Sequence, residues 1–285
     1  MKIAVQGVFN TDLRDVTYGN ARMIAELGFT GIGAHINVPA ESISAATIAA
    51  ARGHIADQGL TWLQLWGKYP CIISPDENVR QAGIAQVREM CALTAKLGVP
   101  GVGVRPTSLN PRGDWWPHPD NYLPQTEDRL VRSLTEIAAI AQDHGLNVVL
   151  EVHQTSTLDT AQTIRRVIDR VGAANMRVNI DVCNFVTDLR TAFHPAAMIR
   201  EHFALLGGFA DTIHLKDYYL EDRLVAHISE TVLGTGLMDW DTLLTEANAN
   251  QPAGWLMIEH LPVSLIQQAK VNLNAQMKTL GIPVG

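Results

Sequence analysis

Four side chains of metal-ligand type stand at the ends of four separate apolar runs in the second half of the chain. They are Glu151 in NVVLEVH, Asp181 in MRVNIDV, His214 in ADTIHLKD and Glu259 in GWLMIEH. Each run holds Val, Ile, Leu or Met and then ends in a group that is costly to bury unless it is paired or bound to a metal. Singly, each residue could be a helix cap or a loop ion pair. One shared metal site accounts for all four.

The donor set of two Glu, one Asp and one His consists mostly of hard oxygen ligands. Such a set suits Mn, Mg or Co better than a structural zinc site rich in thiolates, although zinc remains an alternative. We therefore expect one divalent metal ion, manganese first among the candidates. A metal with open positions polarises a bound carbonyl and acidifies the neighbouring C–H bond. The expected chemistry is proton abstraction beside a carbonyl, with one Glu acting as both ligand and proton carrier.

Short apolar runs alternate with segments of helical period along the whole chain. Alternating strands and helices imply parallel strands joined by right-handed crossovers. Eight such units match a closed (β/α)8 TIM barrel of class α/β in a single domain better than an open doubly wound sheet. The expected strands cover residues 2–8, 31–36, 61–66, 101–105, 147–153, 177–182, 211–217 and 255–260.

The sequence also carries signals for helix ends, but it lacks two common phosphate-binding motifs. Ser74 and Glu77 form a capping-box pattern before a long helical segment, and Gly98 stands where a glycine would end that helix. Neither GxGxxG after the first strand nor GxxxxGK[ST] occurs, so the two phosphate-binding fingerprints of open α/β sheets are absent.

The carboxyl ends of the strands in such a barrel share one rim, where side chains far apart in sequence meet. His153 follows Glu151 by two residues, and Lys216 follows His214 by two, so strand periodicity turns each pair to one face. His153 is a candidate base or additional ligand, or else a hydrogen-bonded structural residue. Lys216 is a candidate to neutralise an enolate or to pair with a metal-binding carboxylate.

Further rim positions follow from the other strands. Arg105 ends the fourth expected strand, where it would bind a substrate oxygen or carboxylate, cap a helix or anchor a loop. His35 and Trp66 end the second and third strands and can line the pocket. Cys183 shares a face with Asp181 and is interpreted as a packing residue.

Two connections are unusually long for such a fold. The segment 106–125 is rich in Pro, Asn and Asp and carries Trp115 and Trp116, and the segment 218–240 follows the strand that bears His214. Long loops at the catalytic rim commonly act as lids. The two indoles are expected either to cover the apolar face of a sugar ring or to pin the loop to the barrel.

The composition of the chain limits the kinds of molecule that the protein is expected to bind. The chain has 285 residues, 47% of them hydrophobic, and a formal net charge of −7, which disfavours nucleic acid and favours a small molecule. Three widely spaced cysteines suggest neither a disulfide framework nor a cysteine-rich zinc motif, so a reducing cytoplasm is expected. The first residues lack a long apolar core, and no apolar stretch reaches about 18 residues, so neither export nor a membrane span is expected.

The segments LEVH, NIDVCN, IHLKD, LGTGLMDW and MIEH, in this order, resemble the xylose-isomerase-like superfamily of sugar isomerases and epimerases. The resemblance covers the whole chain in architecture, as one domain over 1–285, and is specific from about 147 to 260. It implies that Glu151, Asp181, His214 and Glu259 bind a divalent metal. It also implies that Glu151 and Glu259 exchange protons with adjacent substrate carbons.

Three positions depart from the ketose 3-epimerases of that superfamily. Those enzymes usually carry a second Glu, a His and an Arg where this chain has Thr157, Asn184 and Leu220. The family residues grip the sugar around its carbonyl, so the departures argue against a free-ketose 3-epimerase. His153 is the residue expected to compensate.

The residues and the resemblance allow four alternative functions for this protein. The first is a sugar isomerase or epimerase that enolises a metal-bound carbonyl. The second is a lyase, either a dehydratase or a β-eliminase acting on an oxidised (3-oxo) sugar or glycoside, because the same enolate can expel a leaving group. An apurinic-site endonuclease shares the barrel but needs more zinc ligands and a basic groove. A metal-free binding module leaves the four ligands unexplained. Barrels of this size often associate through their helices, so the chain is compatible with a homo-oligomer.

Overall fold

The computed structural model describes residues 1–9 and 12–285, and its central feature is a closed barrel of eight parallel strands. Around the barrel the strands follow the order β1-β10-β7-β6-β5-β4-β3-β2, and β2 pairs with β1 to close it. This confirms the expected (β/α)8 fold. The barrel strands are β1 (Lys2–Phe9), β2 (Gly31–His35), β3 (Thr61–Trp66), β4 (Gly101–Val104), β5 (Asn147–Leu150), β6 (Met176–Ile180), β7 (Ala210–Leu215) and β10 (Trp255–Ile258).

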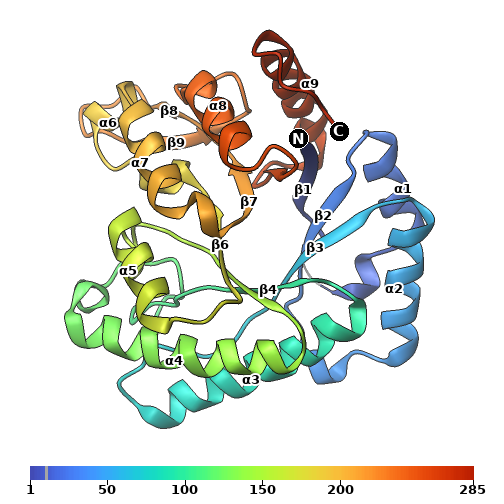
Figure 1. Ribbon diagram of the computed structural model, residues 1–285, viewed down its shortest axis with the longest axis vertical. Coiled ribbons are helices and arrows are strands. Elements are labelled where there is room, and N and C mark those ends of the chain that lie inside the picture. The colour runs from blue at the N-terminus through green and yellow to red at the C-terminus, as the bar shows by residue number, and fades with distance from the viewer. Residues whose placement is uncertain (10–11) are drawn as a thin grey trace.

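Helices surround the barrel on its outside (Figure 1). Their apolar faces and the outward faces of the strands bury one continuous hydrophobic core. Within the described ranges no helix is long and apolar enough to cross a bilayer. The helices are α1 (Tyr18–Glu26), α2 (Ala45–Asp57), α3 (Glu77–Leu97), α4 (Pro124–Asp143), α5 (Ala161–Val171), α6 (Leu189–Phe193), α7 (Ala196–Leu206), α8 (Trp240–Asn250) and α9 (Val263–Thr279).

The start of α3 differs from the expected capping box. Asp76 is the N-cap, and its side chain accepts a hydrogen bond from the backbone N–H of Asn78. The hydroxyl of Ser74 instead accepts from the N–H of Asp76, so the predicted Ser74 and Glu77 pairing is wrong. Asp76 caps the helix in place of Ser74 because its carboxylate lies within reach of the first helical N–H groups. Gly98 ends the helix with a left-handed φ of 72°, as expected.

A two-stranded antiparallel hairpin rises from the rim after β7. Its strands, β8 (Asp217–Leu220) and β9 (Ile228–Thr231), fall in or beside the long connection expected over 218–240. The chain after β9 is held by the buried carboxylate of Asp217. That carboxylate accepts hydrogen bonds from the backbone N–H groups of Tyr218, Gly234, Gly236 and Met238 and from Nε1 of Trp240.

Close packing of β3 against β4 places an aromatic ring at the rim. A Cβ atom at Gly103 would overlap the indole ring of Trp66. Glycine is therefore required in the middle of β4 because the ring lies directly on its backbone. Trp66 is buried there, at the end of β3.

Candidate metal centre

The four residues of ligand type converge on one end of the barrel. Glu151, Asp181 and Glu259 directly follow β5, β6 and β10, and His214 lies within β7. One ligand atom from each of the four lies within 4.8 Å of those of the other three, and all four residues are buried. Parallel strands produce this convergence because their carboxyl ends share one rim.

Several polar atoms in this cluster have no hydrogen-bond partner among the described residues. They include both ring nitrogens of His214, Oε1 of Glu259 and Oδ1 of Asp181. His214 Nδ1 lies 3.0 Å from Glu259 Oε1 and 3.7 Å from Glu151 Oε2, but without hydrogen-bond geometry. Burying unpaired polar atoms is costly, and a divalent cation held here would bind one ligand atom from each of the four residues, including one ring nitrogen of His214. The residues present therefore fit a metal site.

Lys216 belongs to the same buried cluster. Its Nζ lies 2.6 Å from Asp181 Oδ2 and 2.7 Å from Glu259 Oε1. Burial alone would lower the pKa of Lys216, but the charges of these carboxylates raise it well above its ordinary value. The lysine is therefore a permanent cation, and together with one dication it would balance the three carboxylates. Of the two roles expected for Lys216, the structure shows the pairing with carboxylates.

The two glutamates have pKa values shifted in opposite directions. The pKa of Glu151 is raised to about 7, chiefly by burial. The charge of His214 lowers this pKa, whereas the carboxylates of Glu259 and Asp181 raise it. Burial also acts on Glu259, but the charges of His214 and Lys216 prevail and hold its pKa well below the ordinary value. Two carboxyl groups with separated pKa values are the usual arrangement of an acid and a base in one site.

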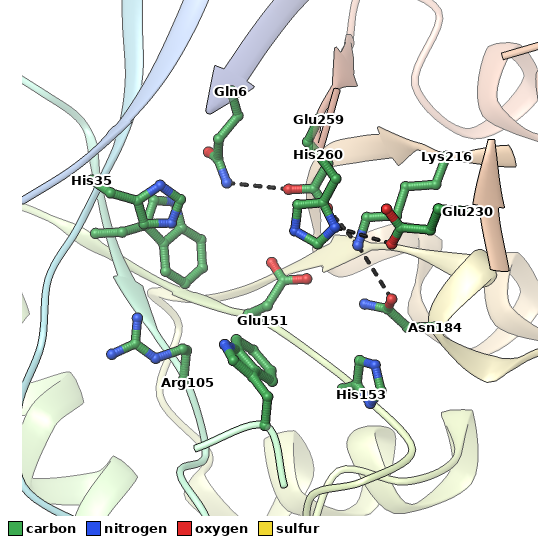
Figure 2. A pocket seen from close by; sticks show the side chains of 12 residues that line it. Gln6, His35, Arg105, Glu151, His153, Asn184, Lys216, Glu230, Glu259 and His260 are labelled. Carbon is green, nitrogen blue, oxygen red and sulfur yellow. Dashed lines mark hydrogen bonds and ion pairs between the residues drawn. The ribbon is translucent and has the colours of Figure 1, made fainter. Parts of the chain in front are cut away.

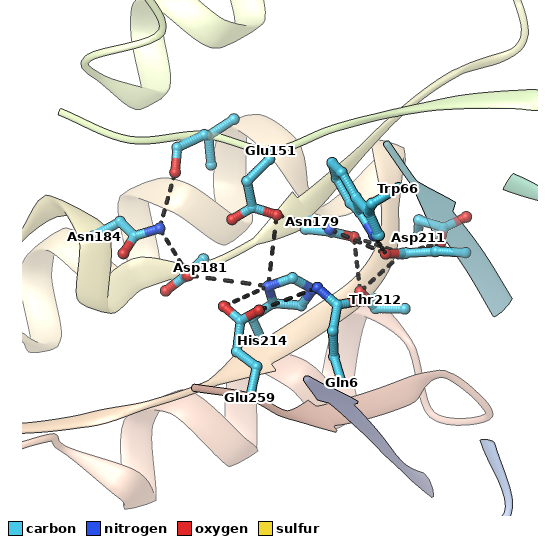
Figure 3. Close-up of polar contacts among 12 residues, drawn as sticks. Gln6, Trp66, Glu151, Asn179, Asp181, Asn184, Asp211, Thr212, His214 and Glu259 are labelled. Atoms are coloured by element: carbon cyan, nitrogen blue, oxygen red, sulfur yellow. Dashed lines mark hydrogen bonds and ion pairs between the residues drawn. The ribbon is translucent and has the colours of Figure 1, made fainter. Parts of the chain in front are cut away.

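A polar network inside the barrel supports Glu151 through Asn179, which lies beside it (Figure 3). Nδ2 of Asn179 donates to Glu151 Oε2 at 3.0 Å. Nε2 of Gln64 in turn donates to Asn179 Oδ1 at 2.7 Å and to Asp211 Oδ2 at 2.6 Å. These bonds fix the orientation of the Glu151 carboxylate. Glu259 has its own support, because Nε2 of Gln6 donates to its Oε2 at 3.3 Å.

A cavity of about 330 Å³ opens above this centre (Figure 2). Its size falls within the ordinary range of small-molecule sites. Besides Glu151 and Glu259, its lining includes six side chains that the sequence analysis singled out and four that it did not propose as site residues. The lining residues are Gln6, His35, Trp66, Arg105, Trp115, Glu151, His153, Asn184, Lys216, Glu230, Glu259 and His260.

His153 lines the cavity with a defined hydrogen-bonding pattern. Its Nδ1 accepts from the backbone N–H of Thr155 at 3.1 Å and lies 2.8 Å from the hydroxyl of the same residue. Burial lowers the pKa of His153 to about 4, so the ring is neutral near pH 7. With Nδ1 accepting, the network assigns the single ring proton to Nε2. His153 is thus arranged as a hydrogen-bond donor rather than as a base.

Arg105 and Trp115 connect the cavity to the loop 106–125. Nε of Arg105 donates to Asp114 at 3.0 Å, and its Nη2 donates to the carbonyl of Gly67 at 2.7 Å. Arg105 therefore both lines the cavity and anchors this loop. The ring centroids of Trp115 and His153 lie 5.8 Å apart.

The second tryptophan of the loop has a different position. Trp116 is not among the residues that line the cavity, and the guanidinium of Arg112 lies 3.5 Å from the centroid of its ring. Its carbonyl accepts a hydrogen bond from the hydroxyl of Ser108. The structure therefore separates the two indoles that the sequence placed together.

Glu230 and His260 are cavity residues that sequence reasoning missed. Nδ1 of His260 lies 3.0 Å from Oε1 of Glu230, which β9 carries over the rim. His260 has a left-handed backbone with φ of 61°, which is uncommon for a residue other than glycine. Its adjacency to Glu259 in GWLMIEH was a usable signal, whereas the position of Glu230 depends on the unexpected hairpin.

Asn184 and Cys183, which come from the 3-10 turn Val182–Phe185 after β6, differ in position. Asn184 lines the cavity, and its Nδ2 donates to Asp181 Oδ2 at 2.8 Å while its Oδ1 accepts from Lys216 at 3.2 Å. Asn184 therefore orients the charge cluster. Cys183 does not line this cavity, and burial raises the pKa of its thiol well above the ordinary value.

Comparison with known proteins gives a family match over most of the chain. A family model described as xylose isomerase-like TIM barrel matches residues 21–277. A curated relative, the probable L-ribulose-5-phosphate 3-epimerase of Mycoplasma pneumoniae, is 20% identical over 205 residues. That match covers 72% of this chain and only 61% of the relative's length.

Solved structures with the same fold cover nearly the whole chain. A xylose isomerase-like TIM barrel protein from Mycobacterium smegmatis, in complex with magnesium, is 18% identical with a TM-score of 0.73, covering 98% of this chain and 96% of its own. The 3-keto-D-glucoside 4-epimerase of E. coli is 19% identical with a TM-score of 0.71, covering 96% of this chain and 99% of its own. At these identities the likeness shows the fold.

Proposed function

Because the chain belongs to the xylose isomerase-like TIM barrel family, we propose that it is a metal-dependent sugar isomerase or epimerase that abstracts a proton beside a carbonyl. The observation that carries the proposal is the buried cluster of Glu151, Asp181, His214 and Glu259 under a cavity of suitable size. The names of the curated relative and of the E. coli structural relative agree with sugar epimerisation.

The proposed metal ligands are Glu151, Asp181, His214 and Glu259. A divalent cation held there supplies Lewis acidity that polarises a substrate carbonyl and makes the adjacent C–H bond acidic. Manganese is the proposed ion, with magnesium, cobalt and zinc as alternatives, because three of the four ligands are carboxylates. The magnesium complex of the M. smegmatis relative supports an ion of this kind.

The proposed proton carriers are the two glutamates. Glu151 and Glu259 both line the cavity, so one is positioned to take the proton from carbon and the other to return it. Nε2 of His153 would donate a hydrogen bond to a substrate oxygen. Arg105 and Trp115 would position the sugar ring, as would the charged head of Lys216. Trp116 would support the loop from outside the cavity.

The proposal extends to setting and partners. The net charge of −7 and the small cavity support a small sugar substrate and argue against nucleic acid. Three free cysteines support a reducing cytoplasm. We propose that residues 1–285 form one barrel domain.

Solvent exchange tests the proposed reaction. The manganese-loaded protein is incubated in heavy water with candidate carbonyl sugars, including 3-keto-glucosides, the class named for the E. coli relative. Enolisation predicts deuterium at the reacting carbon of product and recovered substrate. Loss of a substituent from the β carbon would identify the lyase alternative. Turnover with neither deuterium uptake nor elimination would contradict enolisation. A substrate deuterated at the reacting carbon provides the control, because it shows whether the site returns the same proton to the product without exchange with solvent.

A further inference from the structure

Two polar side chains meet at the mouth of the cavity, and the proposed chemistry uses neither. They are Glu230, which β9 carries, and His260, which follows Glu259 after β10. Their side chains are 45% and 56% exposed, so each lies partly in solvent and partly against the cavity. Nδ1 of His260 lies 3.0 Å from Oε1 of Glu230, and this contact joins the hairpin to the end of β10.

The pair leaves one polar atom of each residue open to a ligand. Burial would raise the pKa of Glu230, but the hydrogen bond from His260 holds it below its ordinary value, so the group is a carboxylate. A carboxylate only accepts hydrogen bonds, so Nδ1 of His260 carries the shared hydrogen. Oε2 of Glu230 and Nε2 of His260 have no hydrogen-bond partner among the described residues. Figure 2 shows Nε2 of His260 turned toward the cavity, on the side of Glu151.

The backbone of His260 is strained. Its φ of 61° is left-handed, and this conformation is costly for a residue with a Cβ atom. The contact with Glu230 does not offset that cost, because half-exposed ion pairs contribute little to stability. Strained residues of this kind cluster at active sites and ligand sites. A function in the cavity therefore explains the strain better than stability does.

The hairpin fixes the position of Glu230 relative to the metal centre. Glu230 pairs with Tyr218 of β8, and β8 begins two residues after β7, the strand that bears His214. The carboxylate of Asp217 holds the chain after β9 through backbone N–H groups. Support from both sides keeps the Glu230 carboxylate in one place, as a substrate-binding group requires.

We propose that Glu230 and His260 together bind two neighbouring hydroxyl groups of the sugar at the cavity mouth, while the metal centre binds its carbonyl. The inference rests on the proposed function, because the metal centre decides where the carbonyl lies. One hydroxyl donates to Oε2 of Glu230, and its neighbour bonds to Nε2 of His260, because a hydroxyl serves as donor or acceptor. A site built for a hydroxyl rejects an analogue that lacks it, since its own polar atoms are then left unpaired. The pair therefore determines specificity.

Steady-state kinetics on the manganese-loaded protein tests the assignment. D-Fructose, L-ribulose and methyl 3-keto-glucoside serve as probes, and the one that wild type turns over fastest becomes the test substrate. Glu230→Ala should raise its KM by about tenfold or more and change kcat much less, because the lost hydrogen bond to a charged group is made before the transition state as well as in it. Asp222→Ala, an exposed carboxylate in the turn of the same hairpin, is the control and should behave as wild type.

Monodeoxy analogues of the test substrate identify the hydroxyls. In wild type at least one analogue should lose about tenfold or more in kcat/KM, and in Glu230→Ala that loss should disappear. An analogue that lacks a hydroxyl bound elsewhere in the cavity should lose as much in the variant as in wild type. The analogue whose loss depends on Glu230 marks the hydroxyl that this carboxylate binds.

Two substitutions of His260 separate the ring from the backbone. Asn and Gly both tolerate the left-handed conformation, so neither His260→Asn nor His260→Gly adds strain. Asn keeps an amide donor for Glu230, so His260→Asn should raise KM less than His260→Gly. Metal content, measured by elemental analysis, should match wild type in both variants.

The outcomes distinguish this assignment from the proposed function. Wild-type KM and kcat in Glu230→Ala would make the contact an ordinary surface ion pair and overturn the assignment alone. A loss of metal from Glu230→Ala would make the pair a support of Glu259, and a fall in kcat at unchanged KM would place it in the chemistry; either result rules out the binding role. Wild-type protein that turns over none of the three probes would count against the proposed function, and the assignment would fall with it.

Discussion

The ammonium group of Lys216 lies 2.6 Å from Oδ2 of Asp181, inside the cluster that carries the candidate metal ligands. Three carboxylates there face Lys216 and His214, and His214 must be neutral to bind a metal, so one lysine and one dication would balance the three carboxylates. Buried charges of this kind are tolerated only when they are paired. Lysine and metal are thus complementary sources of positive charge at one site.

Replacing Lys216 by Met should therefore destabilise the metal-free protein more than the metal-loaded one. Breaking a buried pair leaves uncompensated charge and typically costs about 3–5 kcal/mol. A bound dication would restore part of the balance, so added Mn²⁺ should raise the melting temperature of Lys216→Met by more than that of wild type. The exposed Lys96→Met is the control, and an equal metal-induced rise in all three proteins would contradict this account.

Removing one proposed ligand should abolish metal retention. Wild type is expected to hold about one divalent ion per chain by elemental analysis, and Asp181→Ala much less, because ligand loss removes both charge and a donor atom. Asp169→Ala, an exposed carboxylate of α5, serves as the control and should retain the metal. Equal metal content in Asp181→Ala and wild type would refute the site.

Substitution of His153 by Asn should lower turnover by about 100-fold, the usual scale for a lost donor or acid at a reacting centre. The ring lies at the cavity wall, and its Nε2–H is the group lost. Fold and metal content should be unchanged, as checked by circular dichroism and elemental analysis. Near-normal turnover in this variant would make His153 a structural residue.

Asp217→Asn should destabilise the hairpin side of the barrel. The carboxylate accepts four backbone N–H groups and one indole N–H, and an amide replaces one acceptor oxygen by a competing donor. Leaving buried N–H groups unpaired costs about 1–3 kcal/mol each. Chemical unfolding should show a loss on the order of 2–4 kcal/mol, compared with almost none in the exposed control Asp241→Asn.

The sequence predicted all eight barrel strands because each is a short apolar run. Several of these strands end earlier in the structure than the sequence predicted. The strand expected over 147–153 ends at Leu150, so His153 lies beyond the strand, as does Lys216 beyond Leu215. Neither residue belongs to a strand, yet His153 lines the same cavity as Glu151, as expected, and Lys216 and His214 both lie against Glu259.

The candidate ligands were predictable because each interrupts an apolar run at its carboxyl end. The same signal was present within runs at Gln6, Gln64 and Asn179, where one amide breaks an apolar strand, and it was not used. Glu230 could not be predicted in this way. Its place depends on a short polar hairpin whose pairing is fixed by tertiary contacts rather than by local pattern.

The hydrogen-bonded chain from Asp211 through Gln64 and Asn179 to Glu151 has a consequence for the order of assembly. Its links join residues 147, 115 and 28 positions apart, so no early local element can form it. A half-closed barrel would leave these amides and carboxylates unpartnered, which makes ring closure a late and cooperative event. Because the metal ligands meet only after closure, added metal should slow unfolding and leave the refolding rate nearly unchanged.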